Sequence, residues 1–528
     1  MASLRSFMFH TTPALTRQLS AMSSSIRFNP MFHRDSVPGN RDSSSSATSA
    51  QQAPEYAKVL RTETGLNKAL QDMQYAVRGE LVLRAHKLSH RLENGEKLPF
   101  SEVTYCNIGN PQSVGQNPVS FLRQSIAAVA YPSLLESEHF SSDIIKRAET
   151  FLERCKSVGA YSESKGVDFV RKRVAKAIEE RDGYASDPDL IFLSNGASDA
   201  VKSILQITIR HSEDGVLIPI PQYPLYSATL TALSGRQVGY YLDEEHGWAL
   251  SIDELKKSLN EARKQGTQVR AIVVINPGNP TGQVLSEENM KDIISFCEAE
   301  NLVLMADEVY QNNVYVENKP FVSFKKVVCD MQSSVELASF HSISKGVIGE
   351  CGLRGGYVEL YNTEHEMNEL LNKVCSISLC SNLIGQYAVD LMMTPPKEDE
   401  ESFALYKKET DGIYNDLRIK AQKLCEGLNS LEGVTCNDSE GAMYLFPQIR
   451  IPRKAIEEAK NRGYTCADVL YCMELLEETG ICVVPGSGFG QREGTYHFRT
   501  TFLPTREKID HVVEGIRTFH DRFLRRYS

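Results

Sequence analysis

The sequence predicts an α/β protein in which a large domain, built on a mostly parallel sheet flanked by helices, is joined to a smaller α/β domain. The first observation is a series of short apolar runs, each too short for a helix of its own, that open the segments 190–205, 216–226, 271–282, 302–310 and 335–360. The second is that glycine, proline and polar residues follow each run. Because the intervening chain can hold helical crossovers, the pattern favours parallel strands whose carboxyl ends, and any ligand, share one edge.

Length and composition limit the class of protein. A chain of 528 residues is too long for one core, so two domains and a tail are expected. A net charge of −10 gives no support for nucleic-acid binding, and no apolar run approaches the roughly 18 residues that a membrane span needs. Twelve scattered cysteines without a CxxC pair predict reduced thiols rather than a disulfide or zinc framework, and no metal site is expected.

The N-terminal stretch has the composition of a targeting segment. Residues 1–34 contain four arginines, many serines and no acidic residue, which is typical of a mitochondrial or plastid transit peptide, although a merely disordered tail has the same composition. Residues 35–53 are a low-complexity linker. We therefore exclude 1–50 from the fold and expect the mitochondrial matrix, with the plastid, or the cytosol without this tail, as alternatives.

The rest of the chain divides at changes of pattern. A helical pattern runs over 56–93, and the acidic, proline-containing stretch 395–401 is interpreted as a hinge or surface connection. The predicted parts are an N-terminal arm with a segment of the smaller domain, then the large domain, then the remainder of the smaller domain, over residues 51–120, 121–395 and 396–528.

Lysine 345 lies in the most informative stretch, VELASFHSISKGVIGECGLRGGYVEL, which predicts a strand, a sharp turn and a second strand. A positioned lysine amine can form a Schiff base with a carbonyl. Ser342, Ser344 and Arg354 supply the hydroxyls and the guanidinium that a phosphate monoester needs.

The segment HSISKGVIGECGLRGGY is similar to the cofactor-lysine signature of the pyridoxal-phosphate aminotransferases of fold type I. Its form SKG-x-x-GECG-x-RGGY resembles the alanine aminotransferase branch of that family, and the resemblance extends over nearly everything after about residue 55. It implies the fold type I architecture, a Schiff base between Lys345 and pyridoxal 5′-phosphate, and a phosphate held by Ser342 and Arg354.

Two earlier strand ends offer further cofactor contacts. In LIFLSNGASDAVKSIL a helix starts just after Gly196, and free backbone N–H groups at a helix N-terminus hold anions. The resemblance implies that Ala197 and Ser198 form the phosphate cup. Tyr223, in the proline-rich turn of VLIPIPQYPLY, is a rigid aromatic at a strand exit, and the resemblance places the ring-stacking residue there.

The strand LVLMADEVY ends on Asp307 and Tyr310. A carboxylate in an apolar run needs a partner, because burying an unpaired charge is costly. A protonated pyridine nitrogen would be such a partner and would keep the ring an electron sink. Asn279, in NPTG, and Tyr310 are expected to donate hydrogen bonds to the 3′ oxygen of the ring.

The remaining expected contacts concern the substrate and a second subunit. Arg499 lies in the alternating strand pattern HFRTTFL and matches the arginine that binds the substrate α-carboxylate in the family; a structural ion pair is the alternative. The resemblance puts Gly109 beside that carboxylate, and it implies that Tyr161 reaches the cofactor phosphate of the neighbouring subunit in a homodimer.

The resemblance implies that L-alanine and 2-oxoglutarate exchange to pyruvate and L-glutamate by ping-pong kinetics, with Lys345 as general base and acid. The nearest alternative is a glutamate:glyoxylate aminotransferase, whose signatures are very close. A lyase of the same fold is disfavoured by the GECG-x-RGGY turn. An aminotransferase-like transcription regulator is disfavoured because the first 55 residues are too short and serine-rich for a DNA-binding domain.

Overall fold

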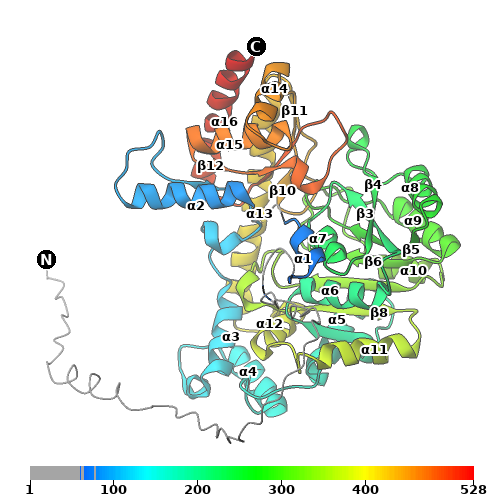
Figure 1. Cartoon of the computed structure of the whole chain (residues 1–528). Helices are drawn as coiled ribbons and strands as arrows, with labels where there is room; N and C mark the ends of the chain where they lie inside the picture. Colours follow the sequence, from blue (N-terminus) through cyan, green and yellow to red (C-terminus); the bar gives the residue numbers. More distant parts are fainter. Residues whose placement is uncertain (1–59, 61–64, 76–78) are drawn as a thin grey trace, which may run out of the picture. The chain divides into compact units, whose positions relative to one another are not determined.

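The computed structural model describes residue 60, residues 65–75 and residues 79–528 (Figure 1). The predicted transit peptide and linker, residues 1–50, lie outside the described residues, as does part of the helix predicted over 56–93. Residues 66–528 form one compact unit. The predicted domain boundaries at 120 and 395 therefore stay predictions.

A seven-stranded sheet forms the centre of this unit, with the strand order β2-β8-β7-β6-β5-β3-β4. Strands β4, β3, β5, β6 and β7 are mutually parallel, whereas β8 runs antiparallel to both of its neighbours. The mostly parallel sheet that the sequence predicts is confirmed. Its strands are β2 (Ile191–Ser194), β3 (Asp214–Ile220), β4 (Arg236–Tyr241), β5 (Gln268–Ile275), β6 (Val303–Asp307), β7 (Leu337–Ser342) and β8 (Gly356–Tyr361).

Helices cover both faces of the sheet (Figure 1). Alternation along β5 shows why: Ile272 and Val274 pack into one apolar cluster, and Ala271, Val273 and Ile275 into the opposite one. The first cluster includes residues of α8 (Ile252–Lys264), α9 (Glu287–Glu300) and α10 (Phe324–Asp330). The second includes residues of α6 (Ala197–Thr208), α7 (Leu225–Ala232) and α11 (His365–Ser376).

Two further apolar clusters complete the unit. One lies among α3 (Ser120–Ala130), α4 (Ser142–Cys155), α5 (Asp168–Asp182) and α12 (Leu383–Met393). The other joins α2 (Glu80–Glu93) to the C-terminal helices α13 (Phe403–Asn429), α14 (Arg453–Asn461), α15 (Ala467–Thr479) and α16 (Arg506–Tyr527). A segment from before the sheet thus shares a core with segments from after it.

Short strands support this C-terminal core. Strand β1 (Thr104–Tyr105) pairs in parallel with β12 (Ile481–Cys482), which joins the early segment to the late one. The antiparallel strands are β9 (Val434–Thr435) with β11 (Gln448–Ile449), and β10 (Tyr444–Leu445) and β13 (Val484–Pro485) on either side of β14 (Phe498–Thr501).

The prediction of one helix over 56–93 is wrong where the structure describes it. Met73 has an extended backbone, with φ −66° and ψ 129°. The hydroxyl of Tyr75 hydrogen-bonds to that of Tyr223 at 2.8 Å, so a tertiary contact fixes the chain where local propensity favours a helix. The described helices there are α1 (Lys68–Asp72) and α2 (Glu80–Glu93).

Among the described residues, no helix combines the length and the apolar character that a membrane crossing requires. All twelve cysteines lie in the described part of the chain and are free thiols, as their scattered positions predict.

Candidate active site

One cavity of about 710 Å³ lies at the carboxyl ends of the parallel strands. Every predicted site residue except Tyr161 lines it, although these residues come from distant parts of the sequence. The chain brings together Gly109, Ala197, Ser198, Tyr223, Asn279, Asp307, Tyr310, Ser342, Lys345, Arg354 and Arg499.

Lysine 345 lies in the turn between β7 and β8 and points into the cavity. Its Nζ donates to the carbonyl oxygen of Gly109 at 2.7 Å and lies 5.8 Å from the centre of the Tyr310 ring. A Cβ at Gly109 would come within 2.9 Å of Nζ and would collide with the hydroxyl of Tyr444. Glycine at this position therefore lets the backbone pass directly beside the lysine amine.

The start of α6 forms a cradle for an anion at one end of the cavity. The helix follows Gly196, whose φ of 79° suits glycine, and its first residues, Ala197 and Ser198, line the cavity. The Arg354 guanidinium donates to the Ser198 hydroxyl at 3.1 Å and to the Asn195 carbonyl at 2.9 Å. A Cβ at Gly196 would lie 2.6 Å from Arg354 Nη2, so the glycine makes room for the guanidinium.

Ser342 is the last residue of β7 and also borders the cavity. Its hydroxyl contacts that of Ser344 at 2.9 Å and the carbonyl of Gly355 at 3.0 Å. Ser344 lines the cavity as well. The two hydroxyls together give this wall a second set of donors next to the lysine.

Asp307 is a buried carboxylate at the end of β6. Tyr226 donates to it at 2.7 Å, and the N–H of Val309 lies 3.4 Å from its other oxygen. Burial raises the pKa of Asp307, and these hydrogen bonds and the charge of Lys345 oppose that rise. Among the described residues Asp307 forms no ion pair, so this carboxylate faces the cavity without a cation close enough to pair with it.

Arg499, on β14, is a buried guanidinium that is 1% exposed. It donates to Asn279 Oδ1 at 3.0 Å and to the carbonyl of Asn107, and its Nε has no hydrogen-bond partner. The rings of Tyr444 and Phe489 lie 4.3 Å and 4.6 Å from the guanidinium carbon. Arg499 forms no ion pair with a described residue, so it can bind a carboxylate that enters the cavity.

Three tyrosines that the sequence analysis missed border or support the site. Tyr75 and Tyr444 line the cavity, and Tyr226 holds Asp307 from behind. Tyr310, which was predicted, donates to the Tyr444 hydroxyl at 3.0 Å. No local motif marks the missed residues, because a phenol in an apolar run has the same pattern whether it packs in a core or faces a ligand.

Tyr161 lies outside the cavity and is 79% exposed. Nothing within this chain tests its predicted contact, which would require a second subunit.

Comparisons with known proteins agree with this geometry. Residues 131–516 match the model of the family "Aminotransferase class I and II". A probable mitochondrial alanine aminotransferase from Dictyostelium discoideum is 53% identical over 89% of this chain and 91% of its own length. Glutamate–glyoxylate aminotransferase 2 from Arabidopsis thaliana is 48% identical over 89% of this chain and 98% of its own.

The crystal structure of an aminotransferase from Escherichia coli has the same architecture, with a TM-score of 0.69 at 25% identity, over 86% of this chain and 98% of the other. The expected fold type I architecture is confirmed. The match of the family model and the identity to the relatives lead to one conclusion: this chain belongs to the class I and II aminotransferases and is a transaminase.

Proposed function

We propose that this enzyme is an alanine aminotransferase that uses pyridoxal 5′-phosphate to exchange L-alanine and 2-oxoglutarate for pyruvate and L-glutamate. The observation that carries the proposal is Arg499, a buried guanidinium that has no carboxylate partner among the described residues and lines the same cavity as Lys345. The preference for alanine is supported by the name of the relative from Dictyostelium discoideum, at 53% identity.

The residues around the cavity suit pyridoxal 5′-phosphate. The first turn of α6, with Ser198 and Arg354, would hold the phosphate. Asp307, buried and without an ion-pair partner in the described chain, would receive the protonated ring nitrogen. Tyr223 would pack on the ring, and Lys345 would reach the aldehyde.

Three residues of the chain then have separate roles in the reaction. When bound, the cofactor supplies an electron sink for the bond that breaks at the substrate Cα. Arg499 binds the α-carboxylate in a fork and so orients the substrate. Lys345 Nζ removes the Cα proton as a general base and later returns a proton as a general acid. Asp307, kept charged by a cationic partner, provides electrostatic stabilisation.

A glutamate:glyoxylate aminotransferase is the second candidate, because such an enzyme from Arabidopsis thaliana is 48% identical to this chain. Both candidates use the same cavity and differ in the oxo acid they prefer. Initial rates with L-glutamate, the amino acid that both candidates use, as donor and either pyruvate or glyoxylate as acceptor separate them. Parallel double-reciprocal lines are expected in both cases, since the donor product leaves before the acceptor binds.

A half-reaction tests the proposal most simply. The purified enzyme, loaded with pyridoxal 5′-phosphate, is mixed with L-alanine and no oxo acid. One pyruvate for each bound cofactor is expected, with loss of the yellow colour. Colour loss with L-glutamate but not with L-alanine would overturn the alanine assignment and keep the enzyme class.

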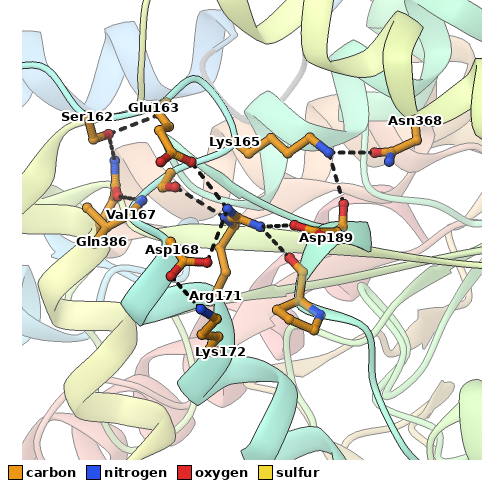
Figure 2. A network of polar contacts seen from close by, with 12 residues as sticks. Ser162, Glu163, Lys165, Val167, Asp168, Arg171, Lys172, Asp189, Asn368 and Gln386 are labelled. Carbon is orange, nitrogen blue, oxygen red and sulfur yellow. Dashed lines mark hydrogen bonds and ion pairs between the residues drawn. The ribbon is translucent and has the colours of Figure 1, made fainter.

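The proposal includes a homodimer, and the segment around Tyr161 supports it. Buried Arg171 forms ion pairs with Glu163, Asp168 and Asp189, while Gln386 bonds to Ser162 and to the N–H of Val167 (Figure 2). The backbone that presents Tyr161 is therefore held in place although its ring is exposed. Such a fixed, exposed aromatic suits a partner surface.

Exposed apolar residues adjoin this segment. Ile377 is 79% exposed and Leu379 is 51% exposed, and the Ser164 hydroxyl donates to the carbonyl of Leu379. Replacing Ile377 and Leu379 together by aspartate should produce monomers in sedimentation experiments. Leu83→Asp, on the exposed face of α2, is the matched control and should leave the assembly intact. Dimers that survive the double change would contradict this interface.

We also propose the mitochondrial matrix as the location, supported by the composition of residues 1–34 and by the word "mitochondrial" in the name of the relative from Dictyostelium discoideum. Residues 1–50 fused to a fluorescent protein should enter mitochondria and be cleaved. Import into plastids or retention in the cytosol would support one of the alternatives.

A further inference from the structure

Tyr444 lines the cavity but has no role in the reaction proposed above. It begins the short strand β10 and pairs with Thr501 of β14, so the sheet that carries Arg499 also fixes Tyr444. The side chain is buried, and it lines the cavity. Buried phenols need a hydrogen-bonding partner, and the one here belongs to the site itself.

The Tyr444 hydroxyl lies close to the lysine amine, on the other side of Gly109. Tyr310 donates to its oxygen at 3.0 Å, with the two rings edge to face. A Cβ at Gly109 would collide with this oxygen and would lie 2.9 Å from Lys345 Nζ. The absence of that Cβ leaves the phenol oxygen and the lysine amine as neighbours across a single glycine.

Positively charged side chains predominate around the Tyr444 hydroxyl. The cations Lys345 and Arg499 face it, and the titratable groups Tyr310, Tyr223 and Cys351 complete its surroundings. Burial would raise the pKa of Tyr444, but the two cations and the hydrogen bond from Tyr310 lower it below the ordinary value, against a smaller opposing effect of Cys351. Because Tyr310 donates, the Tyr444 oxygen can carry a negative charge while accepting a hydrogen bond.

We propose that Tyr444 is a positioning residue that shares a proton with Lys345 Nζ in the proposed aminotransferase reaction. An N–H bond of the Lys345 ammonium breaks as the O–H bond of Tyr444 forms, so that phenolate and ammonium become phenol and amine without any change of oxidation state. The exchange supplies the neutral amine that a general base requires and keeps its proton within the site. This inference rests on the proposed function only for its role in turnover; the shared proton is a property of the chain.

Ionisation of the phenol tests the inference without turnover. The full chain, freed of cofactor, is titrated by the ultraviolet absorbance of phenolate, and the curve of Tyr444→Phe is subtracted from that of the wild type. One tyrosine should ionise below the ordinary value of about 10. Tyr240→Phe, which removes another buried hydroxyl, is the control and should keep this step. A difference curve with no step below that value overturns the proposal.

Lys345→Met tests the partnership. Loss of the neighbouring cation should move the Tyr444 step to higher pH, because phenolate loses an attractive charge. A step that stays in place would show that Lys345 does not share this proton, whatever the enzyme's activity. This outcome is independent of the substrate, so it is distinguishable from a failure of the proposed function.

Kinetics separates proton sharing from a packing role. Tyr444→Phe should lower kcat for L-alanine about 10- to 100-fold with little change in KM, and should increase the isotope effect of Cα-deuterated L-alanine, because proton removal becomes slower. Tyr240→Phe should change neither. A rise in KM alone, with an unchanged isotope effect, would mean that the phenol only helps Arg499 to bind the carboxylate, and would overturn the proposal.

Discussion

The two edges of the central sheet both bury charged side chains, but they treat them differently. Toward the amino ends of the strands, Asp214 opens β3 and is bound by Arg210 through two nitrogens at 2.9 Å. Elsewhere in the same sheet, Glu359 of β8 pairs with Lys325 of α10. At the carboxyl ends, Asp307 faces the cavity with no ion-pair partner among the described residues.

This difference separates buried charges that stabilise the fold by pairing within the chain from buried charges that are available to bind a ligand. A buried pair has exchanged water for a partner within the chain, so removing one member leaves the other uncompensated. An unpaired buried charge lowers the stability of the protein alone, and the fold tolerates it where binding or chemistry uses it. Substitutions at the two edges should therefore have opposite effects on stability and on activity.

The largest effect is expected at Lys345. Lys345→Ala removes both the Schiff-base amine and the general base, so turnover of L-alanine should fall by about 10⁴-fold. The thermal midpoint of the cofactor-free protein should change little, because the amine donates its hydrogen bond to the Gly109 carbonyl at the cavity wall. Activity within tenfold of the wild type, measured as pyruvate release, would refute the assigned role.

Asp307→Asn should follow. The amide keeps the shape and can still accept from Tyr226, but it no longer carries the charge that would pair with a ring nitrogen. We expect kcat to fall by about 10²-fold or more, and the unfolding free energy to stay the same or rise, since a buried charge is removed. A variant that is fully active, or one that is strongly destabilised, would place Asp307 with the structural charges.

Lys325→Met breaks a pair at the other edge. It leaves Glu359 buried without its cation, which should cost about 3–5 kcal/mol of unfolding free energy. Activity for each folded molecule should be unchanged. Replacing Glu359 by leucine in the same chain should restore most of the loss, because no uncompensated charge remains. Urea midpoints of the single and double variants check both statements.

The smallest effect concerns pH. The hydrogen bond from Arg210 lowers the pKa of Asp214 to about 2. A carboxyl whose folded pKa lies below its unfolded pKa of about 3.9 stabilises the fold above the unfolded value, and the contribution is lost as pH falls toward the folded value. Asp214→Asn should thus cost about 1–2 kcal/mol near neutral pH. The difference from the wild type should shrink below about pH 4; a constant difference would contradict the assignment.

The sequence predicts the ligand-facing edge well because its signals are local. Asp307 directly follows an apolar run, and Ser198 and Lys345 each follow one within five residues. A polar residue so close to a strand end needs little else to be placed in a parallel sheet. The mostly parallel direction of the strands follows from the same runs, because the chain between successive runs is long enough for a helical crossover. These features require no knowledge of distant contacts.

Features that depend on distant contacts escape such analysis. Tyr226 reaches Asp307 of β6, and Tyr444 pairs with Thr501 of β14, only in the folded protein. In the sequence, the apolar neighbours of both tyrosines indicate nothing more than a core. The helix predicted over 56–93 fails for the same reason, because the contact between Tyr75 and Tyr223 lies 148 positions apart in the chain. Residue roles toward cofactor and substrate stay proposals.

Arg499→Met offers the most direct test of the contrast between the two edges. In one set of preparations, kcat/KM for L-alanine and the urea midpoint are measured for the wild type, Arg499→Met and Lys325→Met. We predict that Arg499→Met loses about 10²-fold or more in kcat/KM and much less stability than Lys325→Met, because its guanidinium has no anionic partner in the described chain. Equal losses of stability, with alanine turnover retained in Arg499→Met, would show that Arg499 holds the fold rather than the substrate.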